Sequence, residues 1–228
     1  MKTIQGERLI QELLKDPAGF CGCGDDYKLV QECFEGFPVE YLRPLLAHND
    51  RAVRRAIVWP VSELGKEARP LIREAVPLLR DPERYVRAYA LDIIAVCAVA
   101  EDTDKYVHVV RMLEDGDDVI RVRVMFLMSN ADISQLNAAA QSFGAKGSSD
   151  ELHKSGLSQL LTSQFDVGGI SRMIDSPVPL LRRYGAIATW RCREKAPELL
   201  SQLPSSQDPD LKKFWEQRCP QPRGRGVT

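Results

Sequence analysis

The side chains that could perform chemistry in this 228-residue chain are few and far apart. The three histidines, His48, His108 and His153, have no partner at the close spacing that metal ligands show in sequence. The chain contains no His-Glu dipeptide and no G-x-S-x-G, P-loop or G-x-G-x-x-G sequence. We therefore predict no catalytic residue, no bound metal and no cofactor.

The six cysteines are spread thinly along the chain, which is typical of reduced thiols in a cytosolic protein. Cys21 and Cys23 form the only close pair, and they could make half of a metal site or a redox-sensitive pair. Zinc ligands usually come as C-x2-C with a second pair, whereas Cys33 is the only further candidate nearby. A glycine-rich loop is the favoured interpretation of this segment.

Arginine and tryptophan are more informative, because they recur at equivalent places in a repeated phrase. An apolar residue followed by arginine occurs at Val53-Arg54, Val86-Arg87, Ile120-Arg121 and Leu181-Arg182, with spacings of 33, 34 and 61 residues. The last interval is close to two short units. A period in the thirties or forties indicates a repeat protein built from helical pairs.

Each phrase predicts a turn followed by a helix with one apolar face. The residues four, seven and eight positions after the aligned apolar residue are mostly small or apolar, which is the spacing of a helical stripe. They are Ile57, Pro60 and Val61; Ala90, Ile93 and Ile94; Val124, Leu127 and Met128; and Gly185, Ala188 and Thr189. Asp, Asn, Ser or Pro precedes each dipeptide, as expected at a helix N-terminus.

A second helical segment precedes each turn, so the repeating unit is a first helix, a capped turn and a second helix. The first helices are predicted over residues 39–47, 67–79, 105–113 and 160–174. One such pair cannot bury both of its apolar faces, whereas stacked pairs can. The pattern therefore predicts a single all-α domain over residues 1–217.

The segments outside the regular repeat follow from the same signals. Further helices are predicted over residues 3–15, 26–35, 135–143, 151–161, 196–203 and 208–217. The first two form an N-terminal cap, residues 1–36, with a loop over 16–24 between them. Another loop is predicted over 144–150, and residues 218–228 are predicted to be a disordered tail.

The phrases that start at Asp50 (DRAVRRAI), Asp81 (DPERYVRAYAL) and Asp118 (DVIRVRV) resemble HEAT repeats, including the variant called PBS-lyase HEAT-like. The resemblance covers residues 37–130 and, less closely, residues 170–217. It implies a right-handed HEAT-like α-solenoid, an α-α superhelix of about five or six helical pairs. First helices of HEAT repeats are often kinked, and prolines fall in the first helices here.

The first arginines of the second helices would form a row in stacked repeats. They are Arg54, Arg87, Arg121 and Arg182, with Lys212 at a similar place in the last repeat. Each arginine could bond an acidic turn residue of a neighbouring repeat, which is common in HEAT-like repeats and is the favoured interpretation. Alternatively, the row could bind anions or an acidic partner.

In HEAT solenoids the second helices line the concave face, so the resemblance implies a partner-binding surface opposite the buried stripe. Among the residues two, six and nine positions after the aligned residue, the predicted partner-binding residues are Arg55, Trp59, Asp92, Phe126, Arg183, Ile187 and Trp190. Trp and Arg anchor protein interfaces more often than most residues. The alternative is a register shifted by one residue, which would put the large apolar side chains in the core.

Composition limits the classes of partner. The 31 basic and 32 acidic residues give a formal net charge of −1, whereas proteins that hold nucleic acid need a strong basic field. No apolar run approaches the roughly 20 residues that span a bilayer, and the N-terminal segment does not resemble a signal peptide. We expect a cytoplasmic monomer that binds another protein, and we expect neither membrane nor nucleic acid as a partner.

The expected function is non-catalytic protein binding, so no enzyme activity is predicted. The segments that start at Gly36 (GFPVEYLRPLLAHND) and Trp59 (WPVSELG) resemble small bacterial HEAT-repeat proteins. Some of these are immunity proteins that neutralise a cognate toxin. The basic cleft of a toxin that acts on nucleic acid would be met by acidic residues such as Asp92, Glu114, Asp115, Asp117 and Asp118.

Two enzyme classes with this kind of fold are alternatives. Alkylpurine DNA glycosylases of the HEAT-like fold have similar length and use Trp, Arg and Asp on the concave face, which Trp59, Trp190, Asp92 and Arg183 could imitate. Their strongly basic groove has no counterpart in the charge balance of this chain. Phycobilin lyases also use the fold, but no residue pattern here indicates a tetrapyrrole pocket.

Overall fold

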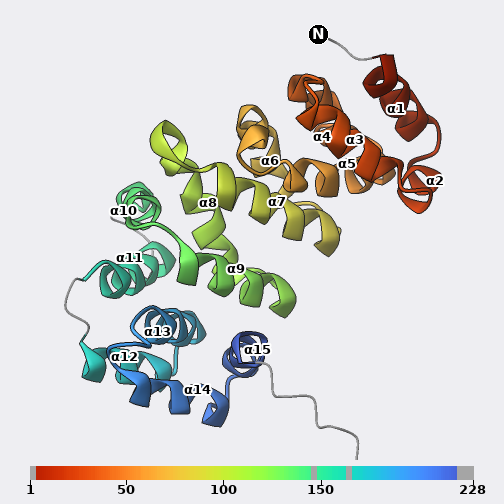
Figure 1. Ribbon diagram of the computed structural model, residues 1–228. Helices are drawn as coiled ribbons and strands as arrows, with labels where there is room; N and C mark the ends of the chain where they lie inside the picture. Colours follow the sequence, from red (N-terminus) through yellow and green to blue (C-terminus); the bar gives the residue numbers. More distant parts are fainter. Residues whose placement is uncertain (1–3, 145–147, 163–165, 220–228) are drawn as a thin grey trace, which may run out of the picture. The chain divides into compact units, whose positions relative to one another are not determined.

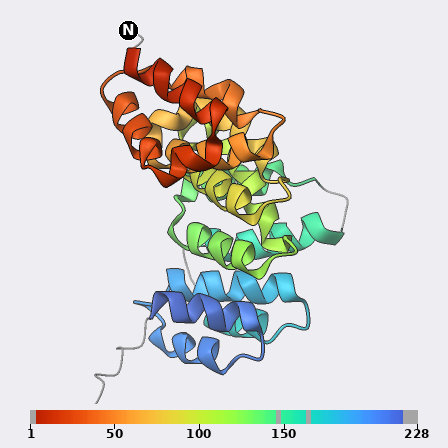
Figure 2. The same cartoon turned by 90° about the vertical axis from the view of Figure 1, so that its right-hand side faces the viewer.

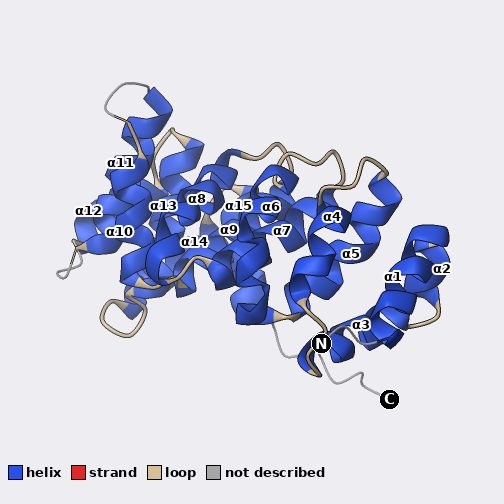
Figure 3. Cartoon of the chain, turned by 90° about the horizontal axis from the view of Figure 1, so that it is seen from above, coloured by secondary structure: helices blue, strands red, loops and turns tan. Residues whose placement is uncertain are grey.

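Residues 4–144, 148–162 and 166–219 are described by the computed structural model of the chain, and the regular structure in these ranges is entirely helical (Figure 3). The all-α class is therefore confirmed. The chain divides into two compact units, Met1–Val109 and Val110–Thr228, which we call the N-terminal unit and the C-terminal unit. The single domain over residues 1–217 stays a prediction. Within the described ranges, no helix has the length and apolar character needed to span a membrane.

The N-terminal unit begins with three short helices, α1 (Ile4–Lys15), α2 (Pro17–Gly22) and α3 (Asp25–Phe34) (Figure 1). The two predicted cap helices are thus confirmed, whereas the loop predicted between them contains α2. The carboxylate of Asp16 accepts a hydrogen bond from the backbone N–H of Gly19 at 3.0 Å, and proline occupies the first turn. An acidic cap followed by proline starts a helix even in this glycine-rich segment.

Two helical pairs follow in the N-terminal unit. The second helix of each pair is continuous, namely α5 (Arg51–Glu63) and α7 (Arg84–Cys97). Each first helix is broken into a 3-10 part and an α part. These parts are η1 (Val39–Leu42) with α4 (Arg43–Leu46), and η2 (Gly65–Leu71) with α6 (Ile72–Leu78). After α7 the chain continues into η3 (Ala100–Lys105) and α8 (Tyr106–Arg111). The two breaks lie close to Pro44 and Pro70. Proline interrupts a continuous α-helix because it lacks the backbone N–H that the helix needs.

The C-terminal unit is built around three long helices, one of which packs against the other two. Its elements are η4 (Met112–Glu114), α9 (Asp118–Asn130), α10 (Ile133–Ser142), α11 (Ser148–Leu161), α12 (Val167–Ile174), α13 (Pro179–Arg191), η5 (Pro197–Ser201), α14 (Gln202–Ser205) and α15 (Pro209–Arg218) (Figure 2). Helix α13 packs against α9, α11 and α12, and α15 packs against both α9 and α13. The last helix therefore covers parts of two earlier second helices.

Three predicted boundaries in the C-terminal unit are wrong. The helix predicted over residues 160–174 is divided, because α11 ends at Leu161 and α12 starts at Val167. Helix α11 starts at Ser148, within the loop predicted over 144–150, and residues 145–147 lie outside the described residues. Helix α15 includes Arg218, where the predicted disordered tail begins, and the part of that tail at 220–228 lies outside the described residues.

The apolar stripe predicted for the second helices is confirmed. At positions four, seven and eight after each aligned apolar residue, every side chain is buried except Leu127, which is half-buried. Burying a large apolar side chain contributes about 1.5–3 kcal/mol, so the repeated phrase supplies much of the core of each unit. Gly185 permits close packing of α13 on α12, because a Cβ atom there would lie 2.8 Å from the backbone nitrogen of Ile174.

The arginine that follows the aligned apolar residue makes the same contact in all four repeats. Its Nη1 donates a hydrogen bond to the backbone carbonyl six residues earlier, in the turn before its own helix. The pairs are Arg54 with His48, Arg87 with Asp81, Arg121 with Asp115 and Arg182 with Ser176, at 2.8, 2.9, 2.8 and 2.8 Å. This contact, the arginine clamp, ties each turn to the helix that follows it.

Two of these arginines also bond an aspartate in the turn of the next repeat. The Nε of Arg54 donates to Asp81 at 2.8 Å, and the Nε of Arg182 donates to Asp208 at 2.6 Å. The other oxygen of Asp208 caps α15 by accepting the backbone N–H of Asp210, whereas that of Asp81 accepts the backbone N–H of Glu83, the residue before α7. The favoured interpretation of the arginine row is thus confirmed at Arg54 and Arg182. Arg121 bonds Asp210 of the last repeat instead.

We expect Arg54→Lys to lower the free energy of unfolding by about 1–3 kcal/mol, because lysine cannot bond Asp81 and the turn carbonyls at the same time. Urea denaturation followed by circular dichroism measures the change. Arg51→Lys is the matched control, since Arg51 lies on the same helix with an exposed side chain and should change little. Equal effects of the two substitutions would contradict the stabilising role of the clamp.

Candidate functional site

The structure places the seven predicted partner-binding residues in two sets. Arg55, Trp59 and Asp92 lie in the N-terminal unit, and Phe126, Arg183, Ile187 and Trp190 lie in the C-terminal unit. The first three are exposed or half-buried, as their positions opposite the apolar stripe predict. Ile187 is 0% exposed, so its predicted place on an open surface is wrong. The reason is that α9, α11, α12 and α15 all pack against α13.

An aromatic strip crosses three helices of the N-terminal unit. We define the N-terminal strip as Tyr27 on α3, Arg55 and Trp59 on α5, and Tyr85 and Tyr89 on α7. Residues four apart on a helix share one face, so α5 and α7 each contribute two side chains to the same side. Helix α5 packs against both α3 and α7, which brings the three contributions together.

The side chains of the N-terminal strip hold one another in place. The ring of Tyr27 lies 4.6 Å from that of Trp59, and the rings of Tyr85 and Tyr89 lie 4.7 Å apart. The guanidinium carbon of Arg55 sits 4.6 Å from the centre of the Tyr85 ring, while its Nη1 bonds Glu83 at 2.8 Å. These contacts restrict the rotamers of Arg55 and the aromatic rings before any partner arrives.

The N-terminal strip remains accessible although its members touch. Tyr27 is 67% exposed, and Trp59, Tyr85 and Tyr89 are half-buried. Burial first and the neighbouring Tyr89 second raise the pKa of Tyr85 to about 12, so its hydroxyl stays protonated at neutral pH. The strip thus offers aromatic area together with hydroxyl and guanidinium donors. Asp92 lies two turns after Tyr85 on α7, is half-buried and takes part in contacts of its own.

The two cysteines near the start of the chain are both free and exposed. Partial burial raises the pKa of the Cys21 thiol, and Asp26 raises it further. The Cys23 thiol bonds a carboxylate oxygen of Asp25 at 3.1 Å, which raises its pKa. Within the described ranges, no three His, Cys, Asp or Glu residues are grouped as metal ligands. Both thiols are therefore mainly protonated at neutral pH, which slows their reactions as nucleophiles.

In the C-terminal unit, two of the predicted residues meet around a residue that sequence reasoning missed. The guanidinium carbon of Arg218 lies 3.9 Å from the ring centre of Phe126, 4.6 Å from that of Trp190 and 5.6 Å from that of Phe214. Trp190 and Phe214 are also in edge-to-face contact. We call Phe126, Trp190, Phe214 and Arg218 the C-terminal cluster. No local pattern indicates it, because Arg218 lies in the predicted tail.

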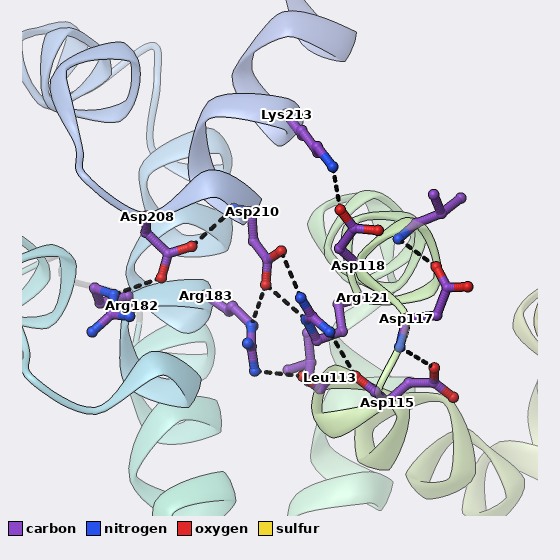
Figure 4. A network of polar contacts seen from close by, with 11 residues as sticks. Leu113, Asp115, Asp117, Asp118, Arg121, Arg182, Arg183, Asp208, Asp210 and Lys213 are labelled. Atoms are coloured by element: carbon purple, nitrogen blue, oxygen red, sulfur yellow. Dashed lines mark hydrogen bonds and ion pairs between the residues drawn. The ribbon is translucent and has the colours of Figure 1, made fainter.

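Arg183 supports the fold of the C-terminal unit. Its Nε donates to Asp210 at 2.8 Å and its Nη1 donates to the backbone carbonyl of Leu113 at 2.8 Å (Figure 4). Arg121 donates to the same carboxylate through Nε and Nη2, at 2.8 and 2.9 Å. Asp210 thus joins α15 to α9 and α13. The small exposed part of the Arg183 side chain, 13%, leaves little of it for a partner.

The acidic residues considered for binding a toxin are also engaged inside the chain. Asp115 and Asp117 accept hydrogen bonds from backbone N–H groups at 2.7 and 2.9 Å, and Asp118 pairs with Lys213 (Figure 4). Glu114 bonds His153 at 3.1 Å. Asp117 caps α9, Asp118 links α9 to α15, and Glu114 links η4 to α11, so these contacts compete with binding of a basic partner.

His153 is buried in a polar network of the C-terminal unit. Its Nδ1 lies 2.8 Å from the hydroxyl of Tyr184, and its Nε2 lies 3.1 Å from a carboxylate oxygen of Glu114. Because an ionised carboxylate only accepts, Nε2 carries the proton and Nδ1 accepts from Tyr184. Burial lowers the pKa of His153, against the opposing effect of Glu114. The imidazole is neutral at pH 7 and has no exposed surface to offer a substrate.

No family model matches the sequence, and no curated protein matches it. The assignment of a function therefore depends on the N-terminal strip and the C-terminal cluster.

Proposed function

We propose that this chain is a non-catalytic protein-binding scaffold and that the N-terminal strip is its binding surface. The observation that carries the proposal is the exposed Tyr27 ring, 67% accessible, held 4.6 Å from Trp59 beside Arg55. Trp, Tyr and Arg are the residues that contribute most binding energy at protein interfaces. An exposed Tyr27 ring against a half-buried Trp59 is otherwise unfavourable in water, because it leaves apolar area uncovered.

Preorganisation supports the same proposal. Binding restricts side chains, and each immobilised flexible side chain costs about 0.5–1.5 kcal/mol. In the N-terminal strip, ring contacts and the Arg55–Glu83 pair already restrict the side chains. Binding of a partner at the strip would therefore cost this chain less conformational entropy than binding at separate, freely rotating side chains.

The finer proposal is a HEAT-like fold and an immunity role. We propose a right-handed α-solenoid of about five or six helical pairs, supported by the arginine clamp that recurs in four turns. As a biological role we propose a cytoplasmic, monomeric immunity protein that neutralises a toxin. Neutralisation needs only a rigid complementary surface, and the mutually held side chains of the N-terminal strip support this proposal.

We expect a photoreactive amino acid at position 27 to crosslink a specific partner protein in a lysate of the source cells, because the Tyr27 side chain lies outermost in the strip. Trp59→Ala should weaken binding of that partner by about 30-fold or more, the usual loss at an interface hot spot. Crosslinking followed by mass spectrometry identifies the partner, and calorimetry with the purified partner measures the affinity.

Tyr41→Ser is the matched control for this experiment, since Tyr41 is a 40% exposed aromatic residue of the same unit outside the strip. Tyr27→Ser is a second variant that tests the same surface and should stay folded, because an exposed ring can be removed with little effect on stability. A partner that binds folded Trp59→Ala and Tyr27→Ser as tightly as the original chain would contradict the proposed surface.

A further inference from the structure

A cavity of about 590 Å³ opens in the C-terminal unit beside the ends of α9, α11 and α13. Part of its lining is apolar and includes Ile133, Leu160 and Leu161. Three cationic residues also line it, and among the residues that the structure describes no Asp or Glu does. The cations are Arg191, Arg193 and Lys195.

The charged side chains that line the cavity are positive, and the nearby Glu194, which is outside the lining, pairs with Arg193 at 3.7 Å. The C-termini of α9, α11 and α13 each contribute a partial negative charge of about −0.5. Their sum is smaller in magnitude than the positive charge of the three cationic side chains. Arg191 satisfies the last carbonyls of α9 by donating to Met128 and Ala131 at 3.1 and 2.9 Å. The positive side chains of the lining favour an anionic ligand.

Arg218 of the C-terminal cluster adjoins the same cavity. It donates a hydrogen bond to Ser129, which lines the cavity, and another to the carbonyl of Phe126 at 3.1 Å. Its Nε is buried and has no hydrogen-bond partner. Among the described residues no carboxylate pairs with Arg218, so its positive charge is compensated only by neutral oxygens and aromatic rings.

Two guanidinium groups lie over one aromatic ring at this place. The guanidinium carbons of Arg218 and Arg193 lie 4.6 and 5.0 Å from the centre of the Trp190 ring. Burial first and Arg193 second lower the pKa of Arg218 to about 10, so Arg218 stays charged at neutral pH. The charge of Arg193 disfavours the charged form of Arg218, and an anion bound near both groups would offset that effect.

We propose that this cavity binds a carboxylate on an acidic, partly apolar peptide segment of the partner protein. Arg193 and Arg218 contact the carboxylate, and the apolar lining receives the neighbouring side chain of the peptide. The inference rests on the proposed protein-binding function for the source of the peptide. A nucleic acid would need cations arranged along its phosphate backbone, whereas these cations converge on one cavity with apolar lining.

The test is isothermal titration calorimetry of the full chain with an end-blocked peptide of alternating leucine and glutamate. We expect this peptide to bind at least about tenfold more tightly than its leucine–glutamine analogue, because only the carboxylate pairs with guanidinium. Arg193→Gln should weaken binding of the glutamate peptide by about tenfold. Arg193 is exposed, and its ion pair with Glu194 is long, at 3.7 Å. Arg193→Gln should therefore leave the fold intact. Arg172→Gln, an exposed arginine of this unit outside the cavity lining, should have no effect.

Several results would overturn the proposal: equal affinity for the two peptides, no binding of either, no effect of Arg193→Gln, or tighter binding of a single-stranded oligonucleotide. Repeating the titration with Tyr27→Ser separates this proposal from that of the N-terminal strip. Peptide binding that persists in Tyr27→Ser, together with no specific crosslink at position 27, would support the cavity and contradict the strip.

Discussion

Asp210→Ala is expected to lower the free energy of unfolding of the C-terminal unit by about 3–5 kcal/mol, the usual loss when one member of a buried ion pair is removed. Asp210 is 1% exposed and accepts three hydrogen bonds from Arg121 and Arg183, at 2.8, 2.9 and 2.8 Å. Without its carboxylate, two largely buried guanidinium groups lose the charge that neutralises them. The substitution also removes the contact that joins α15 to α9 and α13 (Figure 4).

The measurement can be confined to the C-terminal unit. The chain has three tryptophans, and Trp190 and Trp215 both lie in that unit. In a Trp59→Phe background, tryptophan fluorescence during urea denaturation therefore reports only the C-terminal unit. Asp118→Ala is the control, because its pair with Lys213 is exposed and surface pairs contribute little. A loss for Asp210→Ala no larger than that for Asp118→Ala would show that Asp210 does not hold the helices together.

The pH dependence of the Asp210 effect has a definite sign. Burial raises the pKa of Asp210, but the hydrogen bonds from Arg121 and Arg183 outweigh it and the pKa is lowered from 3.8. A carboxylate with a lowered pKa in the folded state stabilises the fold above the unfolded pKa and loses this contribution as pH falls through the folded pKa. The difference between the original chain and Asp210→Ala should therefore be constant near pH 7 and shrink below about pH 4.

Tyr184→Ala is the second substitution with a large expected effect, a loss of about 3–5 kcal/mol in the free energy of unfolding. The ring of Tyr184 is completely buried and packs so closely on α11 that a Cβ atom at Gly156 would lie 2.2 Å from it. Gly156 has no side chain and so leaves room for the Tyr184 ring. Alanine at position 184 would therefore create a cavity between α11 and α13. The hydroxyl that donates to Nδ1 of His153 would be lost as well.

Tyr184→Phe separates the hydroxyl from the ring. It keeps the packing but leaves the buried Nδ1 of His153 without a donor, which costs about 1–3 kcal/mol. Unfolding is followed as for Asp210, and the imidazole is observed by NMR to detect its changed environment. Tyr27→Phe removes an exposed hydroxyl and is the control, with no change expected. If Tyr184→Phe were as stable as the original chain, with an unaltered His153 spectrum, the proposed hydrogen bond would be absent.

Local features of the fold could be predicted from the sequence because they depend on residues close together along the chain. The apolar stripes of α5, α7, α9 and α13 follow from spacings of three and four, and most of those side chains are buried. Aspartates before α5 and α9 cap these helices as expected. The breaks near Pro44 and Pro70 follow from the missing N–H of proline. Helix α2 was missed, since the glycines around it indicated a loop.

The candidate sites needed the tertiary structure. Arg55, Trp59 and Phe126 are at least partly exposed, as their positions on single helices predict. The pairing of Tyr27 with Trp59 depends on how α3 packs against α5, and no periodic pattern encodes that contact. Arg218 reaches Phe126 from 92 residues further along the chain. Such neighbours are set by the packing of whole helices.

The amino-acid sequence alone determined the helical class, the repeated pair of helices and the aspartate partners favoured for the clamp arginines, because each follows from short-range spacing and charge. The tertiary structure decided which second-helix faces stay open. Helix α13 is enclosed by four neighbours, so Ile187 is core, whereas α5 keeps Arg55 exposed and Trp59 half-buried. Periodicity identifies the two faces of one helix, but only the number and placement of its neighbours decide whether the second face meets solvent.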